Sequence, residues 1–264
     1  MSYDSLGTRM KGYESVSRFY LTKRTPVVIR IDGKSFHTFT RGFERPFDRY
    51  LMQTMRETAK YLCENIGGCK LAYTQSDEIS LLLVDYDTVD MQPWFDNNLQ
   101  KLVSITASMA TFAFNKFFGE GLKSLKCRDG EQLSEDRVKH YDCLTKAAAK
   151  GALFDSRAFT LPKEEVCNYF IWRQQDATRN SISMVAQAFF SHKQLQGKKR
   201  DEMQDMLFTE HGINWNDYSP SEKRGTCIVK QAYDKNGTTR YRWVVDEDTP
   251  IFTQDRAYIE SLVK

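Results

Sequence analysis

The sequence lacks the features that identify zinc-binding, disulfide-rich and membrane proteins. Its six cysteines include no C-x-x-C pair and its four histidines lie far apart, so neither a zinc knuckle nor a disulfide framework is indicated. No segment approaches the roughly 18 uninterrupted apolar residues that span a membrane, and the first twenty residues contain no signal-peptide core. We therefore expect reduced thiols, a cytoplasmic location and no membrane partner.

A strong net charge is missing as well. The 38 lysine and arginine residues are nearly balanced by 35 aspartate and glutamate residues, which leaves +3, so only a local cluster of basic residues could bind a nucleic acid. Apolar residues, in contrast, make up 41% of the 264 positions. This is enough for one large domain, or for two small domains that share an interface, and it excludes a disordered or fibrous protein.

Residues 1–162 carry a regular succession of patterns. A β-branched run alternates so that Val27, Ile29 and Ile31 share one face, which predicts a buried strand ending at Asp32. Apolar steps of three and four residues predict helices, and two short apolar runs have the spacing of a hairpin. In chain order, the predicted elements are a strand at 26–33, a helix from 46 to 66, strands at 70–74 and 79–84, a helix over 94–116 and a strand at 154–159.

This βαββαβ order predicts an α+β fold with a ferredoxin-like core, in which an antiparallel sheet has helices on one face. The polar and weakly patterned stretch at about 119–151 reads as an insertion. Residues 163–264 predict further helices and a hairpin that turns at Asn236-Gly237. Because no repeat or low-complexity linker separates the two parts, we expect a single catalytic unit in which 163–264 packs on the core.

The candidate site follows from this topology. The first and second strands run the same way, so the end of the first strand and the hairpin turn meet at one edge of the sheet. Asp32 and Asp77 should therefore meet there, with Glu78 beside them and the Gly33 carbonyl close by. Two aspartates and a carbonyl make an all-oxygen site suited to Mg²⁺, and two such ions could clamp a phosphoryl or nucleotidyl transfer.

A simpler reading of these residues remains open. Asp-Gly is a common turn dipeptide, and Asp-Glu at a hairpin tip is often only a solvated turn. Two like charges at one sheet edge, however, repel each other unless a cation or a proton lies between them. This repulsion favours the paired site over two unrelated turns.

Five motifs extend the site beyond the carboxylates. They are Arg30-Ile31-Asp32-Gly33-Lys34-Ser35-Phe36-His37, Arg45-Pro46-x-Asp48, Tyr73-Thr74-Gln75-Ser76-Asp77-Glu78-Ile79-Ser80, Trp172-Arg173-Gln174-Gln175-Asp176 and Lys223-Arg224-Gly225-Thr226. Together they resemble the tRNA(His) guanylyltransferase family and its bacterial, archaeal and phage relatives, the Thg1-like proteins. The resemblance implies a palm-like core shared with DNA polymerases and adenylyl cyclases. It also implies nucleotide addition to the 5′ end of RNA, in the reverse, 3′-to-5′ direction.

The resemblance also assigns roles to particular residues. Asp32, the Gly33 carbonyl and Asp77 are expected to hold two Mg²⁺ ions, Glu78 matches a neighbouring acidic residue needed for activity, and Arg45 matches a basic residue that helps the activation step. The residues expected to bind the nucleotide are Asp32, Gly33, Lys34, Ser35, Phe36, His37, Asp48, Ser76, Asp77 and Lys101. ATP and GTP or other nucleoside triphosphates are the implied substrates, tRNA rather than DNA the implied partner, and a homotetramer the implied assembly.

One departure from the family pattern concerns the choice of RNA. Eukaryotic members carry His-Ile-Asn-Asn-Leu-Tyr-Asn where this chain has Thr178–Met184. We therefore expect template-directed repair of 5′-truncated tRNA, with a dedicated tRNA(His) guanylyltransferase as the alternative and a palm-type nucleotidyl cyclase or a non-catalytic RNA-binding module as more remote ones. Arg179, Asn180, Lys198, Lys199 and Arg200 are candidates for RNA contacts, although an exposed loop explains the last three equally well.

Overall fold

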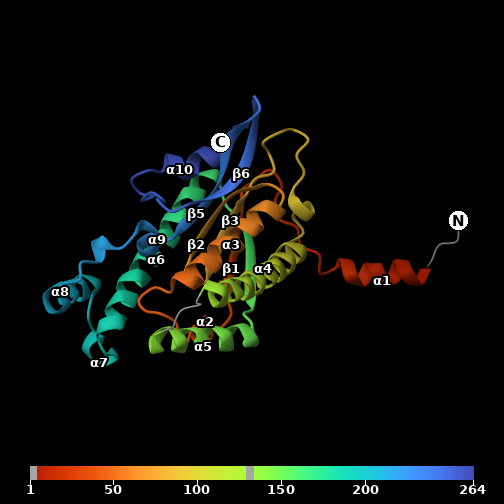
Figure 1. The fold of residues 1–264 in the computed structure, drawn as a ribbon. Coiled ribbons are helices and arrows are strands. Elements are labelled where there is room, and N and C mark those ends of the chain that lie inside the picture. Colours follow the sequence, from red (N-terminus) through yellow and green to blue (C-terminus); the bar gives the residue numbers. More distant parts are fainter. Residues whose placement is uncertain (1–4, 129–133) are drawn as a thin grey trace.

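The computed structural model describes residues 5–128 and 134–264, which form one twisted sheet between two layers of helices (Figure 1). The six strands lie in the order β4-β1-β3-β2-β5-β6, and every neighbouring pair is antiparallel. The strands are β1 (Val27–Gly33), β2 (Cys69–Gln75), β3 (Glu78–Leu83), β4 (Phe154–Thr160), β5 (Thr226–Lys235) and β6 (Thr238–Asp246). The order of the first four confirms the predicted ferredoxin-like core.

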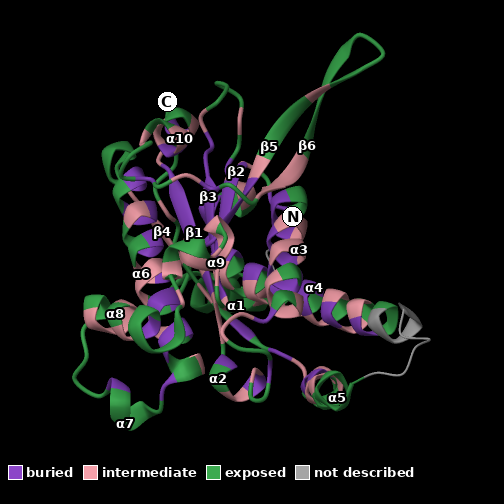
Figure 2. Ribbon diagram, turned by 60° about the vertical axis from the view of Figure 1, so that its left-hand side comes forward, coloured by how far each residue is buried: buried purple, intermediate pink, exposed green. Residues whose placement is uncertain are grey.

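Alternation along β1 sends side chains to two separate apolar cores. Ile29 and Ile31 pack beneath α3 (Arg49–Asn65) and α4 (Leu99–Arg128), which cover one face of the sheet. Val28 points to the other face, where α6 (Lys163–Phe189) and the C-terminal residues cover it. Figure 2 shows the buried residues concentrated in the central strands and on the sides of the helices that face them. The helices of the core thus lie on one face, as predicted, and the C-terminal part covers the other.

An aromatic cluster joins the end of β1 to α4. Phe36, in the short helix α2 (Phe36–Phe39), contacts Phe39, Phe114 and Phe154, with ring centroids 5.1 to 5.5 Å apart. Its ring also lies against Gly33, where a Cβ atom would come within 2.2 Å of the ring. Only glycine therefore permits this approach at the end of β1.

The other helices surround this frame. They are α1 (Ser5–Ser15), α5 (Glu135–Lys150), α7 (His192–Leu195), α8 (Arg200–His211), α9 (Pro220–Arg224) and α10 (Ala257–Glu260), with single 3₁₀ turns at Trp94–Asn97, Trp215–Asp217 and Ser261–Val263. Helix α1 has no buried residue and extends away from the rest of the chain (Figure 1). The hairpin of β5 and β6 projects beyond the sheet (Figure 2).

The observed helices differ from the predicted ones at their ends. The first begins at Arg49 rather than at 46, because the Asp48 carboxylate accepts a hydrogen bond from the Leu51 amide and so caps the helix. Residues 94–97 form a separate turn with left-handed residues, so α4 begins only at Leu99. In the predicted insertion, α4 continues to Arg128 and α5 follows, while 129–133 lie outside the described residues.

The structure bears on two expectations from the sequence, one about disulfides and one about membrane-spanning segments. Five cysteines have side chains that the structure describes, and none of them forms a disulfide. Within 5–128 and 134–264, no helix combines the length and the apolar composition needed to cross a membrane.

The aromatic cluster predicts a contrast between two phenylalanines of α4. Phe114 is fully buried, whereas Phe112 on the same helix is 58% exposed. Phe114→Ala should lower the free energy of unfolding by about 3 to 5 kcal/mol, because a cavity replaces a ring in a packed core. Phe112→Ala is the matched control and should cost less than about 1 kcal/mol. Urea denaturation measures both, and equal losses would show that the cluster is not the centre of the core.

Candidate active site

Main-chain pairing brings Asp32 and Asp77 to one edge of the sheet. Strand β3 lies between β1 and β2 and is antiparallel to both, so the end of β1 faces the turn between β2 and β3. Asp32 is directly opposite Glu78, and the Gly33 amide donates a hydrogen bond to the Asp77 carbonyl at 3.1 Å. The aspartates are therefore neighbours, as the topology predicts.

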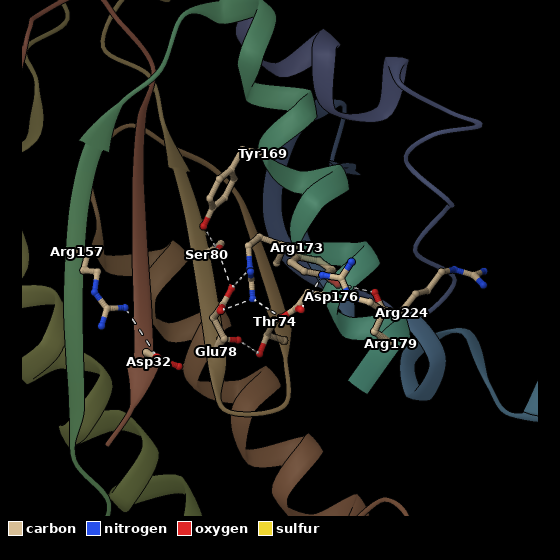
Figure 3. Close-up of polar contacts among 11 residues, drawn as sticks. Asp32, Thr74, Glu78, Ser80, Arg157, Tyr169, Arg173, Asp176, Arg179 and Arg224 are labelled. Atoms are coloured by element: carbon tan, nitrogen blue, oxygen red, sulfur yellow. Dashed lines mark hydrogen bonds and ion pairs between the residues drawn. The ribbon is translucent and has the colours of Figure 1, made fainter. Parts of the chain in front are cut away.

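The two aspartates have different electrostatic surroundings. Burial raises the pKa of Asp77 to about 6, and the negative charge of Asp32 adds to this increase. The Asp32 side chain is 38% exposed and lies 3.8 Å from the Arg157 guanidinium, which reaches across from β4 (Figure 3). A cation close to Asp77 would favour its ionised form. The electrostatics and the hard oxygen donors thus both fit a divalent cation such as Mg²⁺.

A cleft of about 680 Å³ opens over this edge. Nine of the predicted site residues line it, namely Asp32, Gly33, Ser35, Phe36, His37, Arg45, Asp48, Ser76 and Asp77. Three residues predicted for catalysis or nucleotide binding do not line it, namely Lys34, Glu78 and Lys101. Lys34 is exposed beside the cleft, and Lys101 lies on α4 with its ammonium 5.6 Å from the centre of the Phe95 ring.

The Glu78 side chain is buried between β3 and α6. It is 8% exposed and receives two hydrogen bonds of 2.8 Å from the guanidinium of Arg173 on α6 (Figure 3). Burial raises the pKa of Glu78, and the paired Arg173 opposes that increase. Both carboxylate oxygens are thus occupied by protein. Glu78 fixes α6 against the strand that carries Asp77.

Asp48 has structural partners as well as a place in the cleft wall. It caps α3 and contacts Nε2 of His140 on α5 at 2.7 Å, while Nδ1 of His140 lies 3.5 Å from Glu44. The three side chains offer ligand atoms within 4.8 Å of one another and could hold a metal ion. Both ring nitrogens of His140 already face a carboxylate, so these contacts tie α5 to the wall of the cleft.

The five residues predicted to contact RNA do not form one surface. Arg179 and Arg200 line a second cavity between α6 and α8, while Asn180 lines a small pocket beside Ser76 and Asp48. Lys198 lies 3.4 Å from Glu202 in an exposed ion pair, and Lys199 is the exposed residue that precedes α8. Positive charge in the sequence was therefore not sufficient to show which of these residues share a surface.

Two functional candidates were not predicted. Arg157 lies beside Asp32 and Asp155, and Arg173 holds Glu78 and Asp176. Asp155 stands opposite Asp32 in the pairing of β1 with β4. The alternation of Asp155 and Arg157 along the last strand of the core could have shown that both share a face, but the register that brings them to Asp32 depends on the fold.

An antiparallel palm-like sheet with paired aspartates at the edge of a nucleotide-sized cleft is typical of nucleotidyltransferases. The comparison with known proteins agrees, because the model of the tRNAHis guanylyltransferase family matches residues 7–162. The chain belongs to this family and is a nucleotidyltransferase. The family resemblance seen in the sequence motifs is thereby confirmed.

Individual relatives extend this likeness over most of the chain. The tRNA(His) guanylyltransferase of Debaryomyces hansenii is 28% identical and covers 84% of this chain and 81% of its own. An uncharacterized protein of Acanthamoeba polyphaga mimivirus is 26% identical over 99% of this chain and 88% of its own. A bacterial tRNA(His) guanylyltransferase-like protein solved in complex with ATP is 49% identical, covers 98% of this chain and 99% of its own, and has a TM-score of 0.83.

The raised pKa of Asp77 predicts how stability depends on pH in metal-free protein. A folded carboxyl with a higher pKa than the unfolded one binds the extra proton in the folded state, so stability falls as the pH rises from about 4 to about 6. Asp77→Asn should remove this loss and be more stable than the parent by about 2 to 3 kcal/mol at neutral pH. The difference should vanish below about pH 4.

Urea denaturation in the presence of a chelator, repeated across this pH range, measures the effect. Asp142→Asn, an exposed acid on α5, controls for the loss of one charge. Superimposable pH curves for Asp77→Asn and the parent would contradict the raised pKa.

The pair of Glu78 and Arg173 predicts a second stability effect. Arg173→Met leaves a buried carboxylate without its partner and should lower the free energy of unfolding by about 3 to 5 kcal/mol. The double variant Glu78→Gln/Arg173→Met removes both charges and should regain a large part of this loss. Chemical denaturation of the two variants decides the point, since a double variant no more stable than the single one would show that the charge pair is not the cause.

Proposed function

We propose that this protein adds nucleotides to the 5′ end of tRNA in the 3′-to-5′ direction, in a reaction that depends on Mg²⁺ and is directed by the opposite strand. Its task would be the repair of 5′-truncated tRNA. The observation that carries the proposal is the pair of aspartates, Asp32 and Asp77, at the edge of a cleft of about 680 Å³. The family supports it, and so do solved bacterial relatives in complex with ATP and with GTP.

The residues present fit the expected metal. Carboxylate oxygens of Asp32 and Asp77 and the Gly33 carbonyl would hold Mg²⁺, which prefers oxygen ligands and leaves positions for substrate phosphates. When bound, the metal would neutralise charge on the phosphates and lower the pKa of the attacking hydroxyl. The chain itself places the two carboxylates side by side through main-chain hydrogen bonds, so the site needs no rearrangement of the sheet.

The order of chemical steps follows from the leaving groups. A 5′-monophosphate is a poor electrophile, because its leaving group would be oxide. Adenylylation by ATP, or a 5′-triphosphate already present, supplies a better leaving group before the 3′-hydroxyl of the incoming nucleotide attacks. Arg45 in the cleft wall and Lys34 beside it are placed to stabilise the negative charge that spreads over the phosphates.

Positive charge and aromatic rings gather on the projecting hairpin of β5 and β6. In the strand pairing, Gln231 faces Arg242 and Tyr233 faces Arg240, so both arginines and Tyr233 share one face of an exposed two-stranded ribbon. Basic groups bind phosphates without reading sequence, and aromatic rings stack on unpaired bases. An enzyme that takes sequence information from base pairing with the opposite strand requires no more than this kind of contact.

The proposal predicts extension of a tRNA that lacks its first nucleotide, in the presence of Mg²⁺, ATP and the four nucleoside triphosphates. Asp32→Asn and Asp77→Asn should each reduce extension about a hundredfold or more, because each removes a charged metal ligand while keeping the size of the side chain. Extension is followed on sequencing gels, with Asp142→Asn as the matched control. Full activity in both variants would refute the proposed site.

Substrate choice is tested in the same assay. Varying the base opposite the missing nucleotide, in tRNA(His) and in other tRNAs, should change the nucleotide that is added. Addition of G alone, to tRNA(His) alone, would instead identify a dedicated tRNA(His) guanylyltransferase, which is the name that several curated relatives carry. The predicted homotetramer and the cytoplasmic location remain predictions.

A further inference from the structure

A second cavity lies on the side of α6 that faces away from the catalytic cleft. It measures about 480 Å³, is open to solvent and is lined by α6, the first turns of α8 and the segment at 251–253. Along α6, Ile171, Thr178 and Ile182 line this cavity. Ala177 and Met184 line the pockets beside the catalytic edge. At about 100° per residue, the centres of these two sets lie roughly 130° apart around the helix. The cavity also shares no lining residue with the catalytic cleft, so it is separate from the proposed nucleotide site.

Two arginines from different helices line this cavity. Arg179 comes from α6 and Arg200 from the start of α8, and none of the described residues that line the cavity is acidic. Arg200 forms no ion pair with any residue that the structure describes. An anion placed between Arg179 and Arg200 would be attracted by both. Planar guanidinium groups match phosphate oxygens especially well.

Arg179 is held in place by a chain of charges that leads to the catalytic edge. Asp176 accepts one hydrogen bond of 2.9 Å from Arg179 and another of 2.9 Å from Arg173, which in turn binds Glu78 (Figure 3). Although burial raises the pKa of Asp176, the two arginines hold it below its usual value. The Asp176 carboxylate therefore stays charged and orients Arg179, which leaves its other nitrogens for a ligand in the cavity.

The rest of the lining indicates what kind of phosphate fits. Thr178, Thr253, Gln175 and Gln204 add neutral polar groups, and three isoleucines complete the wall. No aromatic side chain is among these described residues, so the cavity offers no stacking surface for a nucleobase. The chemistry suits the sugar-phosphate backbone better than a free nucleotide.

We propose that the cavity between α6 and α8 binds backbone phosphates of the RNA substrate through Arg179 and Arg200. This inference rests on the proposed function and adds an RNA-binding site on the side of α6 away from the reaction. It also divides the predicted RNA contacts, because Asn180 faces the catalytic side and Lys198 is paired with Glu202.

The test is the salt dependence of RNA binding. Binding of a 5′-truncated tRNA is measured by filter binding without nucleoside triphosphates, over a series of salt concentrations. Arg179→Gln and Arg200→Gln should each weaken binding about five- to tenfold. Each should also reduce the slope of log affinity against log salt by about 0.7 to 0.9, because one phosphate contact is lost. Arg200→Lys keeps the charge and should keep most of the slope.

Lys123→Gln is the matched control, since Lys123 is an exposed cation on α4, on the opposite face of the sheet. It should leave the slope unchanged. An unchanged slope in both arginine variants would overturn the proposal. So would a loss of ATP or GTP affinity without a loss of RNA affinity, because the cavity would then bind free nucleotides.

The two proposals fail separately. Wild-type protein that binds RNA with the expected slopes, but never extends it, would leave the cavity as an RNA site and refute the proposed function. Arginine variants that bind as the parent does, in a protein that extends tRNA, would refute only the cavity proposal. A parent protein with no RNA affinity at all would refute both.

Discussion

Two carboxylates are kept side by side, against their mutual repulsion, by hydrogen bonds of the main chain. The ladder of β1 and β3 sets Asp32 opposite Glu78, and the contact from Gly33 to Asp77 closes the edge. Since the sheet is secured by two apolar cores, the positions of the aspartates do not depend on their own interactions. The fold therefore bears an electrostatic cost that a bound cation would remove, and this is why we propose the reaction at that edge.

Two kinds of charged groups surround this edge: a buried ion pair and arginines that are exposed to solvent. Glu78 and Arg173 neutralise each other in the interior and hold α6 in place. Arg45, in contrast, is exposed and lines the cleft, and Arg157 is exposed beside Asp32 and Asp155. The buried ion pair fixes the position of α6, whereas an exposed arginine would bind the phosphates of a substrate. The arginines near this edge therefore have different roles.

The sequence was sufficient for the order of the four core strands and for the meeting of Asp32 and Asp77, because alternation and hairpin length determine how such a core folds. It did not show that the hairpin of β5 and β6 extends the same sheet beside β2. It was not sufficient for the partners of the site residues. Arg173 is remote from Glu78 along the chain, and only the packing of α6 shows that they meet. The start of α3 was misplaced because the role of Asp48 as a cap depends on one hydrogen bond that periodicity does not encode. Arg179 and Asn180 line different cavities for a geometric reason, since successive residues of a helix point about 100° apart.

Helix α6 forms a wall of two cavities at once, and this has a mechanical consequence. This helix is 27 residues long, so a tilt of the whole helix that narrows the space on one side would widen the space on the other. Occupation of either flank by a bulky anion would resist that tilt. Binding of RNA in the cavity between α6 and α8 would in this way change the width of the catalytic cleft, in which the 5′ end of the same RNA is proposed to react.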